Sequence, residues 1–206
     1  MSLRERWIDA VHRAATGTRP TRTLLTPVGV AVFGGFIALF VLAGILVDSL
    51  LTLPKLLPES ARLPLAIPTM ATGLGFTAWS AFHFLRARGT PVPFNPPPRL
   101  VTSGPYRLSR NPMLTGVFLF FLGLGFAVDS VSLVLVFVPL FILVNVWELK
   151  AIEEPELVMR LGDEYVEYRR RTPMFIPRIR RGNPSVNPVR KPTESPPNRK
   201  ASRDEG

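Results

Sequence analysis

The sequence predicts an all-α polytopic membrane protein with four transmembrane helices, the last two of which form a tight hairpin, and with both termini in the cytoplasm. Two observations support this prediction, and a third excludes several kinds of site. The chain of 206 residues is 47% hydrophobic, yet its formal net charge is +10. The charged side chains are absent from four long windows and crowd into the segments between them. The absence of cysteine excludes disulfide frameworks, thiolate metal sites and cysteine nucleophiles.

This segregation of charge excludes two further classes. A nucleic-acid-binding domain would present basic residues along one face of its folded elements, so no nucleic-acid partner is predicted. A chain that is disordered throughout would lack long apolar runs. The membrane is therefore the expected partner of the uncharged windows.

The first two windows are long enough to cross a bilayer. Residues 23–47 carry no charge, and residues 63–85 contain His83 as their only titratable side chain. A hydrocarbon core of about 30 Å requires about 20 helical residues. Each of these windows is therefore predicted to be a transmembrane helix.

The third and fourth windows predict a helical hairpin. Residues 111–128 and 130–147 are uncharged runs of 18 residues each, separated only by Asp129. At about 1.5 Å per residue, each run nearly crosses the bilayer core. We expect the chain to turn at Asp129 and Ser130.

Two helices are predicted after the hairpin. The first, in residues 147–171, continues out of the membrane, and a second and shorter one follows Gly162. Tyr165 and Tyr168 are three residues apart, so they should share a face of the shorter helix.

The distribution of lysine and arginine gives the orientation. From the N-terminus, the segments outside the windows contain five, two, five, zero and thirteen of these residues. Basic residues favour the cytoplasmic side, so both termini and the middle loop are predicted to be cytoplasmic. The chain then divides into a basic N-terminal segment (1–22), two transmembrane helices (23–90), a core with a proline-rich loop, the hairpin and cytoplasmic helices (91–181), and a disordered tail (182–206).

The glycines and histidines fit no soluble-enzyme motif. Two Gly-x-Gly fragments lie inside apolar windows, with no strand before them and no acidic partner after them. They are interpreted as sites of close helix packing, and they comprise Gly73, Gly75, Gly123 and Gly125. His12 and His83 are far apart in the sequence, so no metal site or catalytic triad is predicted. His83 is expected to make a polar contact at a helix end.

Two polar clusters flank the predicted hairpin. The basic cluster precedes Pro112, at the first turn of a helix, where proline is favoured, and it comprises Tyr106, Arg107, Arg110 and Asn111. The acidic cluster follows the second arm and comprises Glu148, Lys150, Glu153, Glu154 and Glu156. A hairpin brings both clusters to one membrane face. The first suits a carboxylate or phosphate, and the second suits a cationic or hydroxyl-rich group. Alternatively, both clusters only anchor the hairpin at the membrane surface.

Four sequence pieces resemble the isoprenylcysteine carboxyl methyltransferase and phospholipid methyltransferase superfamily. They are L-V-T-S-G-P-Y at residues 100–106, R-N-P-M at 110–113, E-E at 153–154, and L-G-D-E-Y-x-x-Y at 161–168, with Pro173 beyond. The resemblance implies an integral membrane methyltransferase that uses S-adenosylmethionine at the cytoplasmic end of its helices. It also implies a lipid or lipid-linked methyl acceptor.

The resemblance also implies roles for individual residues. The catalytic residues would be Glu153, on the acceptor side, Glu154 and Arg110. The residues around the cofactor would be Pro98, Arg99, Leu100, Val101, Tyr106, Asn111, Pro112, Met113 and Leu114. No metal is implied.

Three positions depart from the family pattern. Asn111 replaces a histidine and Leu114 replaces a tyrosine. Leu149 stands where the carboxyl methyltransferases have a basic residue, although Lys150 is adjacent. The reference activity is carboxyl O-methylation of an amphiphilic acceptor. The alternatives are a phospholipid amine N-methyltransferase, a related NADPH-dependent membrane reductase, and a membrane scaffold without enzymatic activity.

Overall fold

The structure, a computed structural model, describes residues 5, 19–87, 97 and 99–176. Most of the predicted N-terminal segment, most of the proline-rich loop, Pro98 and the predicted tail lie outside the described residues. His12 also lies outside them. The fold below concerns the described ranges.

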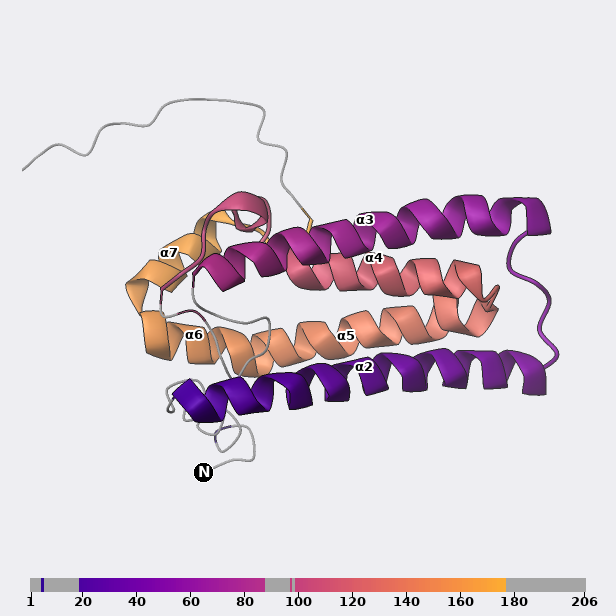
Figure 1. Cartoon of the computed structure of the whole chain (residues 1–206), viewed down its shortest axis with the longest axis horizontal. Helices are drawn as coiled ribbons and strands as arrows, with labels where there is room; N and C mark the ends of the chain where they lie inside the picture. Colours follow the sequence, from indigo (N-terminus) through magenta and orange to yellow (C-terminus); the bar gives the residue numbers. More distant parts are fainter. Residues whose placement is uncertain (1–4, 6–18, 88–96, 98, 177–206) are drawn as a thin grey trace, which may run out of the picture.

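Long helices run side by side and alternate in direction (Figure 1). They are α2 (Arg19–Leu50), α3 (Glu59–Arg86), α4 (Pro112–Ala127) and α5 (Val138–Glu148). Shorter elements complete the fold: the 3-10 turn η1 (Gly104–Arg107), the π-helical segments η2 (Leu133–Phe137) and η3 (Leu149–Glu153), and helices α6 (Glu154–Leu161) and α7 (Asp163–Arg171). The described part of the chain contains no strand, in agreement with the all-α prediction.

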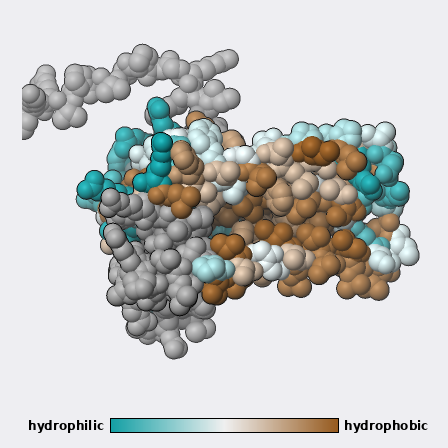
Figure 2. Space-filling view, viewed as in Figure 1, coloured by the Kyte–Doolittle hydropathy of each residue, from teal (hydrophilic) through white to brown (hydrophobic). Residues whose placement is uncertain are grey.

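Hydropathy and length mark two helices as candidate membrane spans. They are Pro27–Leu50, within α2, and the continuous helix Leu133–Leu161, which joins η2, α5, η3 and α6. Helix α4 is apolar but shorter. The surface is apolar along the middle of the bundle and polar at its ends (Figure 2). These features support a membrane protein, whereas the number of four spans and the cytoplasmic termini stay predictions.

Glycines allow α3 and α4 to pack in direct contact. A Cβ atom on Gly73 would meet the backbone nitrogen of Phe120 and would lie 2.6 Å from the carbonyl oxygen of Gly116. A Cβ on Gly123 would lie 2.8 Å from the backbone nitrogen of Met70. The close-packing interpretation is therefore confirmed for these glycines. It is wrong for Gly75, which is exposed and has no atom near its Cβ position, because it lies on the face of α3 turned away from α4.

Aromatic side chains fill the core between the hairpin and α2. Phe121 of α4 and Phe141 of α5 are fully buried, and their ring centroids are 5.0 Å apart. Phe40 of α2 packs its ring edge-on against Phe141 at 5.9 Å. Gly125, the remaining glycine of the predicted packing set, approaches Val134 across the hairpin, so its interpretation is also confirmed.

The predicted turn at Asp129 and Ser130 is confirmed. Asp129 adopts a left-handed φ of 56° between the two arms of the hairpin. Its carboxylate accepts hydrogen bonds from the backbone N–H groups of Leu56 and Leu57, each at 3.0 Å. The α2–α3 connection is thereby tied to the tip of the hairpin.

The opposite end of the bundle gathers segments that are far apart in the sequence. The end of α3, the turn η1, the start of α4, and helices α6 and α7 all lie at this end (Figure 1). The predicted pair of helices after the hairpin is confirmed, because Gly162 separates α6 from α7 with a φ of 59°. The site is built at this end.

Candidate active site

The start of α4 is fixed by backbone hydrogen bonds from the segment after α7. The N–H of Arg110 donates to the carbonyl of Pro173 at 2.8 Å, and the N–H of Asn111 donates to the carbonyl of Met174 at 3.1 Å. Pro112 occupies the first turn of α4, as the sequence predicts. The basic cluster is thereby held in place by chain that follows it by about sixty residues.

An ion pair joins this cluster to the acidic one. The Arg110 guanidinium donates to the carboxylate of Glu154 at the start of α6, and both side chains are nearly buried, at 12% and 13% exposed. Arg169 of α7 lies 3.6 Å from the other oxygen of Glu154. The two clusters therefore meet at one end of the bundle, as predicted.

Glu153 differs from its neighbour Glu154. Within the described part of the chain, its partly buried carboxyl makes no hydrogen bond or ion pair. The charged groups that surround it are mostly acidic: Glu148, Glu154 and Glu156, with Arg160 as the basic one. This arrangement leaves Glu153 available to a ligand with a positive charge or a proton to donate.

Buried tyrosines connect α7 to η1. The hydroxyl of Tyr168 donates to the carbonyl of Tyr106 at 2.7 Å, and both residues are buried. Tyr165 lies beside Arg110, and its burial raises its pKa to about 12. Burial also raises the pKa values of Tyr106 and Tyr168 above the ordinary value. All three phenols are therefore neutral at physiological pH.

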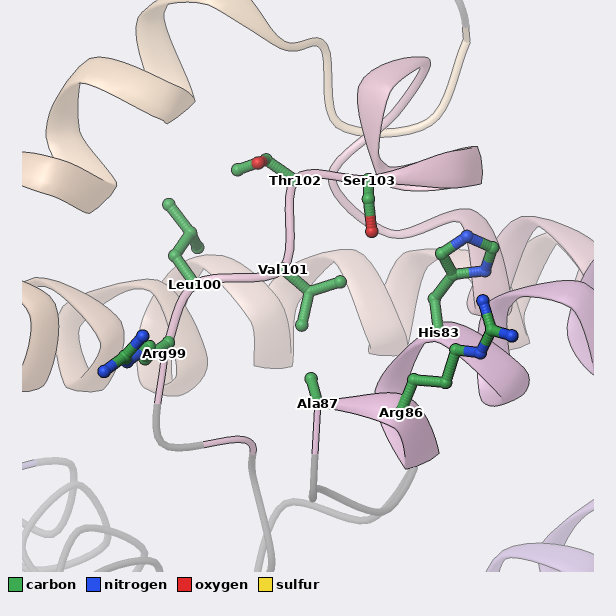
Figure 3. A pocket seen from close by; sticks show the side chains of 8 residues that line it. All are labelled: His83, Arg86, Ala87, Arg99, Leu100, Val101, Thr102 and Ser103. Atoms are coloured by element: carbon green, nitrogen blue, oxygen red, sulfur yellow. The ribbon is translucent and has the colours of Figure 1, made fainter.

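A pocket of about 450 Å³ lies between the end of α3 and the segment that precedes η1 (Figure 3). One wall comes from His83, Arg86 and Ala87, and the other from residues 99–103. Arg86 stacks over the ring of Phe82, with 4.4 Å between its guanidinium carbon and the ring centroid. The pocket combines two guanidinium groups with apolar side chains and two hydroxyls, so it can hold a ligand that has an anionic group and an apolar body.

His83 supports the pocket wall. Its Nδ1 lies 3.0 Å from the carbonyl oxygen of Trp79, which fits the predicted helix-end contact. Its ring also packs against Gly104, where a Cβ atom would collide with the imidazole. Since Gly104 has a φ of 58°, glycine is favoured there for two independent reasons.

The structure places the predicted cofactor residues in two groups. Arg99, Leu100 and Val101 line the pocket. The others do not line the pocket: Tyr106 lies in η1, Asn111 immediately precedes α4, and the first residues of α4 are Pro112, Met113 and Leu114. Pro98 is outside the described residues.

Sequence reasoning did not assign several residues that the structure brings to the site. His83 and Arg86 line the pocket. Arg160 is paired with Glu156 and also reaches the backbone of Pro97. The four-residue spacing of Glu156 and Arg160 is a sequence signal for their pair, but nothing in the sequence indicates the contact with Pro97.

Leu149 stands where the carboxyl methyltransferases have a basic residue, and the structure shows how it and the adjacent Lys150 are placed. Leu149 is fully buried, whereas Lys150 is exposed.

In the described ranges, no group of three or more histidine, cysteine, aspartate or glutamate side chains is arranged to hold a metal ion.

Comparison with known proteins identifies the family. The family model for phospholipid methyltransferases matches residues 61–164, which is just over half of the chain. The chain belongs to the phospholipid methyltransferase family, within the isoprenylcysteine carboxyl methyltransferase-like superfamily. Membership implies a membrane methyltransferase.

Two curated relatives have names that refer to metal resistance. The chain is 35% identical over 80 residues to the nickel-cobalt-cadmium resistance protein NccN of Alcaligenes xylosoxydans xylosoxydans, covering 39% of this chain and 37% of that protein. It is 38% identical over 80 residues to the cobalt-zinc-cadmium resistance protein CzcN of Cupriavidus metallidurans, covering 39% and 36%. The match thus spans little more than a third of each relative. No solved structure matches.

Proposed function

We propose that this protein is an integral membrane methyltransferase that uses S-adenosylmethionine to methylate a lipid or lipid-linked acceptor. Family membership supports the methyltransferase class. The single observation that supports the reaction centre is the placement of Glu153, which lacks a partner in the described chain and lies next to the Arg110–Glu154 pair, at the same end of the bundle as the pocket.

The pocket fits the proposed cofactor. Its volume of about 450 Å³ is in the range of small-molecule sites. Arg86 can pair with a carboxylate, and Val101 can cover an apolar surface. The hydroxyls of Thr102 and Ser103 can bond to polar groups, and Arg99 lies on the opposite side of the pocket from Arg86 (Figure 3). Pro98, Asn111 and Leu114 belong to this proposed site by family resemblance.

The chemistry requires alignment more than strong acid or base groups. S-adenosylmethionine supplies an activated methyl group when it is bound. The protein must hold the acceptor in line with that group and exclude water. The Arg110–Glu154 pair fixes the start of α4 against α6, and Glu153 orients the acceptor.

The charges near Glu153 favour an amine acceptor over a carboxylate acceptor. Glu148 adds negative charge beside it, whereas Glu156 is paired with Arg160. The basic residue that would attract a carboxylate is replaced by buried Leu149, and the adjacent Lys150 is exposed. An amine must lose a proton before it accepts a methyl group, and Glu153 is the candidate base.

The proposed function can be tested with methyl-labelled S-adenosylmethionine and membranes that contain the protein. Labelled lipid should form, and the label should resist mild base, because a methylated amine is stable where a methyl ester is hydrolysed. Release of the label as volatile methanol on treatment with base would assign carboxyl methylation instead. Binding of NADPH in place of S-adenosylmethionine would indicate the reductase alternative. Binding of neither compound would favour the alternative of a membrane scaffold without enzymatic activity.

Variants test the assigned residues. Glu153→Gln should reduce methyl transfer by roughly 100-fold or more, while S-adenosylmethionine still binds. Glu167→Gln is the control, because Glu167 is an exposed glutamate that pairs only with arginines of its own helix in the described chain. If Glu153→Gln and Asn111→Ala both left cofactor binding and methyl transfer intact, the assigned site would be wrong.

A further inference from the structure

The segment that forms one wall of the pocket is held at both ends by side chains from the C-terminal helices. Residues 99–103 line the pocket. Pro97 precedes this segment and Tyr106 follows it, and both are buried. The carbonyl oxygen of Pro97 accepts a hydrogen bond from Arg160, and that of Tyr106 accepts one from Tyr168.

Arg160 makes two contacts with one guanidinium group. Its Nε donates to Glu156 at 2.8 Å, and a terminal nitrogen donates to the carbonyl of Pro97 at 3.0 Å. The side chains of Arg160 and Glu156 are only 14% and 4% exposed. A guanidinium group has donors pointing in several fixed directions, whereas the ammonium group of lysine is a single centre. Lysine at this position could keep the ion pair but could not also reach Pro97 in the same geometry.

Tyr168 holds the other end of the segment. Its hydroxyl donates to the carbonyl of Tyr106 at 2.7 Å and lies 3.5 Å from the carbonyl oxygen of Ser109. The ring of Tyr106 packs against Phe84 of α3, with 5.0 Å between centroids. Tyr106 is therefore fixed between α3 and α7.

We propose that Arg160 and Tyr168 are positioning residues that set the shape of the pocket and its distance from Glu153. This inference rests on the proposed function. Glu153 and Arg160 lie on the same continuous helix, Leu133–Leu161. They are seven residues apart, which is about two turns. One continuous helix therefore carries the acceptor-side carboxylate and also anchors the pocket wall. Because methyl transfer depends on the alignment of donor and acceptor, this helix couples the two halves of the site.

The test uses Arg160→Lys and Tyr168→Phe, each of which removes one anchor with little change of volume. Arg171→Lys is a matched control, since Arg171 also pairs through its Nε with a glutamate four residues before it, Glu167, at 3.2 Å, but on the surface. The full-length proteins are purified in the same detergent. The dissociation constant of S-adenosylmethionine is measured by calorimetry, and Tm is measured on the same samples.

Arg160→Lys should raise the dissociation constant roughly tenfold, and Tyr168→Phe should raise it about threefold to tenfold, as expected for the loss of one buried hydrogen bond. Arg171→Lys should change it less than twofold. A lower Tm with an unchanged dissociation constant would mean that the anchors only stabilise the fold, and it would overturn the proposal. So would equal affinities of Arg160→Lys and Arg171→Lys. Failure of the wild-type protein to bind S-adenosylmethionine would instead refute the proposed function.

Discussion

Replacing Glu154 by glutamine tests the ion pair that joins the start of α4 to α6. The substitution keeps the shape of the side chain and leaves the guanidinium of Arg110 without its anionic partner. Breaking one side of a buried pair costs about 3–5 kcal/mol. The pair is 12% and 13% exposed, so some solvent reaches it, and we expect a cost of about 2–3 kcal/mol. For a chain of this size, that corresponds to a fall in Tm of roughly 4–12 °C.

The assay is thermal unfolding of the purified protein in one detergent at fixed concentration. Glu167→Gln serves as the control. Because Glu167 pairs with the exposed residues Arg170 and Arg171, its replacement should lower the free energy of unfolding by less than about 1 kcal/mol. The double variant Glu154→Gln with Arg110→Gln should lose much less stability than the sum of the losses of the two single variants, because it also removes the charge that Glu154→Gln leaves unpaired. Equal Tm values for Glu154→Gln and Glu167→Gln, or additive losses in the double variant, would refute the reasoning.

Three further predictions concern packing and titration. Gly73→Ala should lower Tm by several degrees, because its Cβ would meet the α4 backbone, whereas Gly75→Ala should leave Tm equal or higher, since Gly75 faces open space and alanine favours helix. Gly104→Ala should lower Tm and weaken binding of S-adenosylmethionine, because the new methyl group collides with His83 at a left-handed φ; unchanged binding would contradict this structure of the pocket wall. The three tyrosines of the chain should show little phenolate absorbance at 295 nm near pH 10, where an exposed tyrosine is half ionised, and Tyr165 should reach half ionisation only near pH 12, its raised pKa. The contribution of Tyr165 to stability is complete below about pH 10 and is lost as the pH rises toward 12; a tyrosine that titrates normally in the folded protein would contradict the burial.

Local patterns were sufficient to predict the main helices. Uncharged windows indicated the long helices, and Asp129 between two of them indicated the hairpin turn. Gly162 indicated the break between the last two helices. Each of these features depends on residues that are neighbours along the chain, which is why hydropathy and spacing reveal them.

The interpretation of Gly75 as a site of close helix packing was wrong because it relied on the local sequence alone. Gly73 and Gly75 have the same local sequence character, but only one of them faces α4. In a helix, residues two apart point in different directions. The face that meets a neighbouring helix is fixed by packing, and the sequence around a single glycine does not specify it.

The sequence by itself determined that the basic and acidic clusters share one end of the bundle, because a hairpin returns the chain to its starting side. Only the tertiary structure decided which glutamate forms an ion pair. Arg110 pairs with Glu154, 44 residues further along the chain, and Glu153 has no such partner in the described chain. It also decided that Arg160 reaches Pro97 across 63 residues and that Tyr168 reaches Tyr106 across 62. The physical reason is that a buried donor bonds to the acceptor that packing brings within about 3 Å, and this acceptor is often a backbone carbonyl, which every residue carries and no sequence pattern marks.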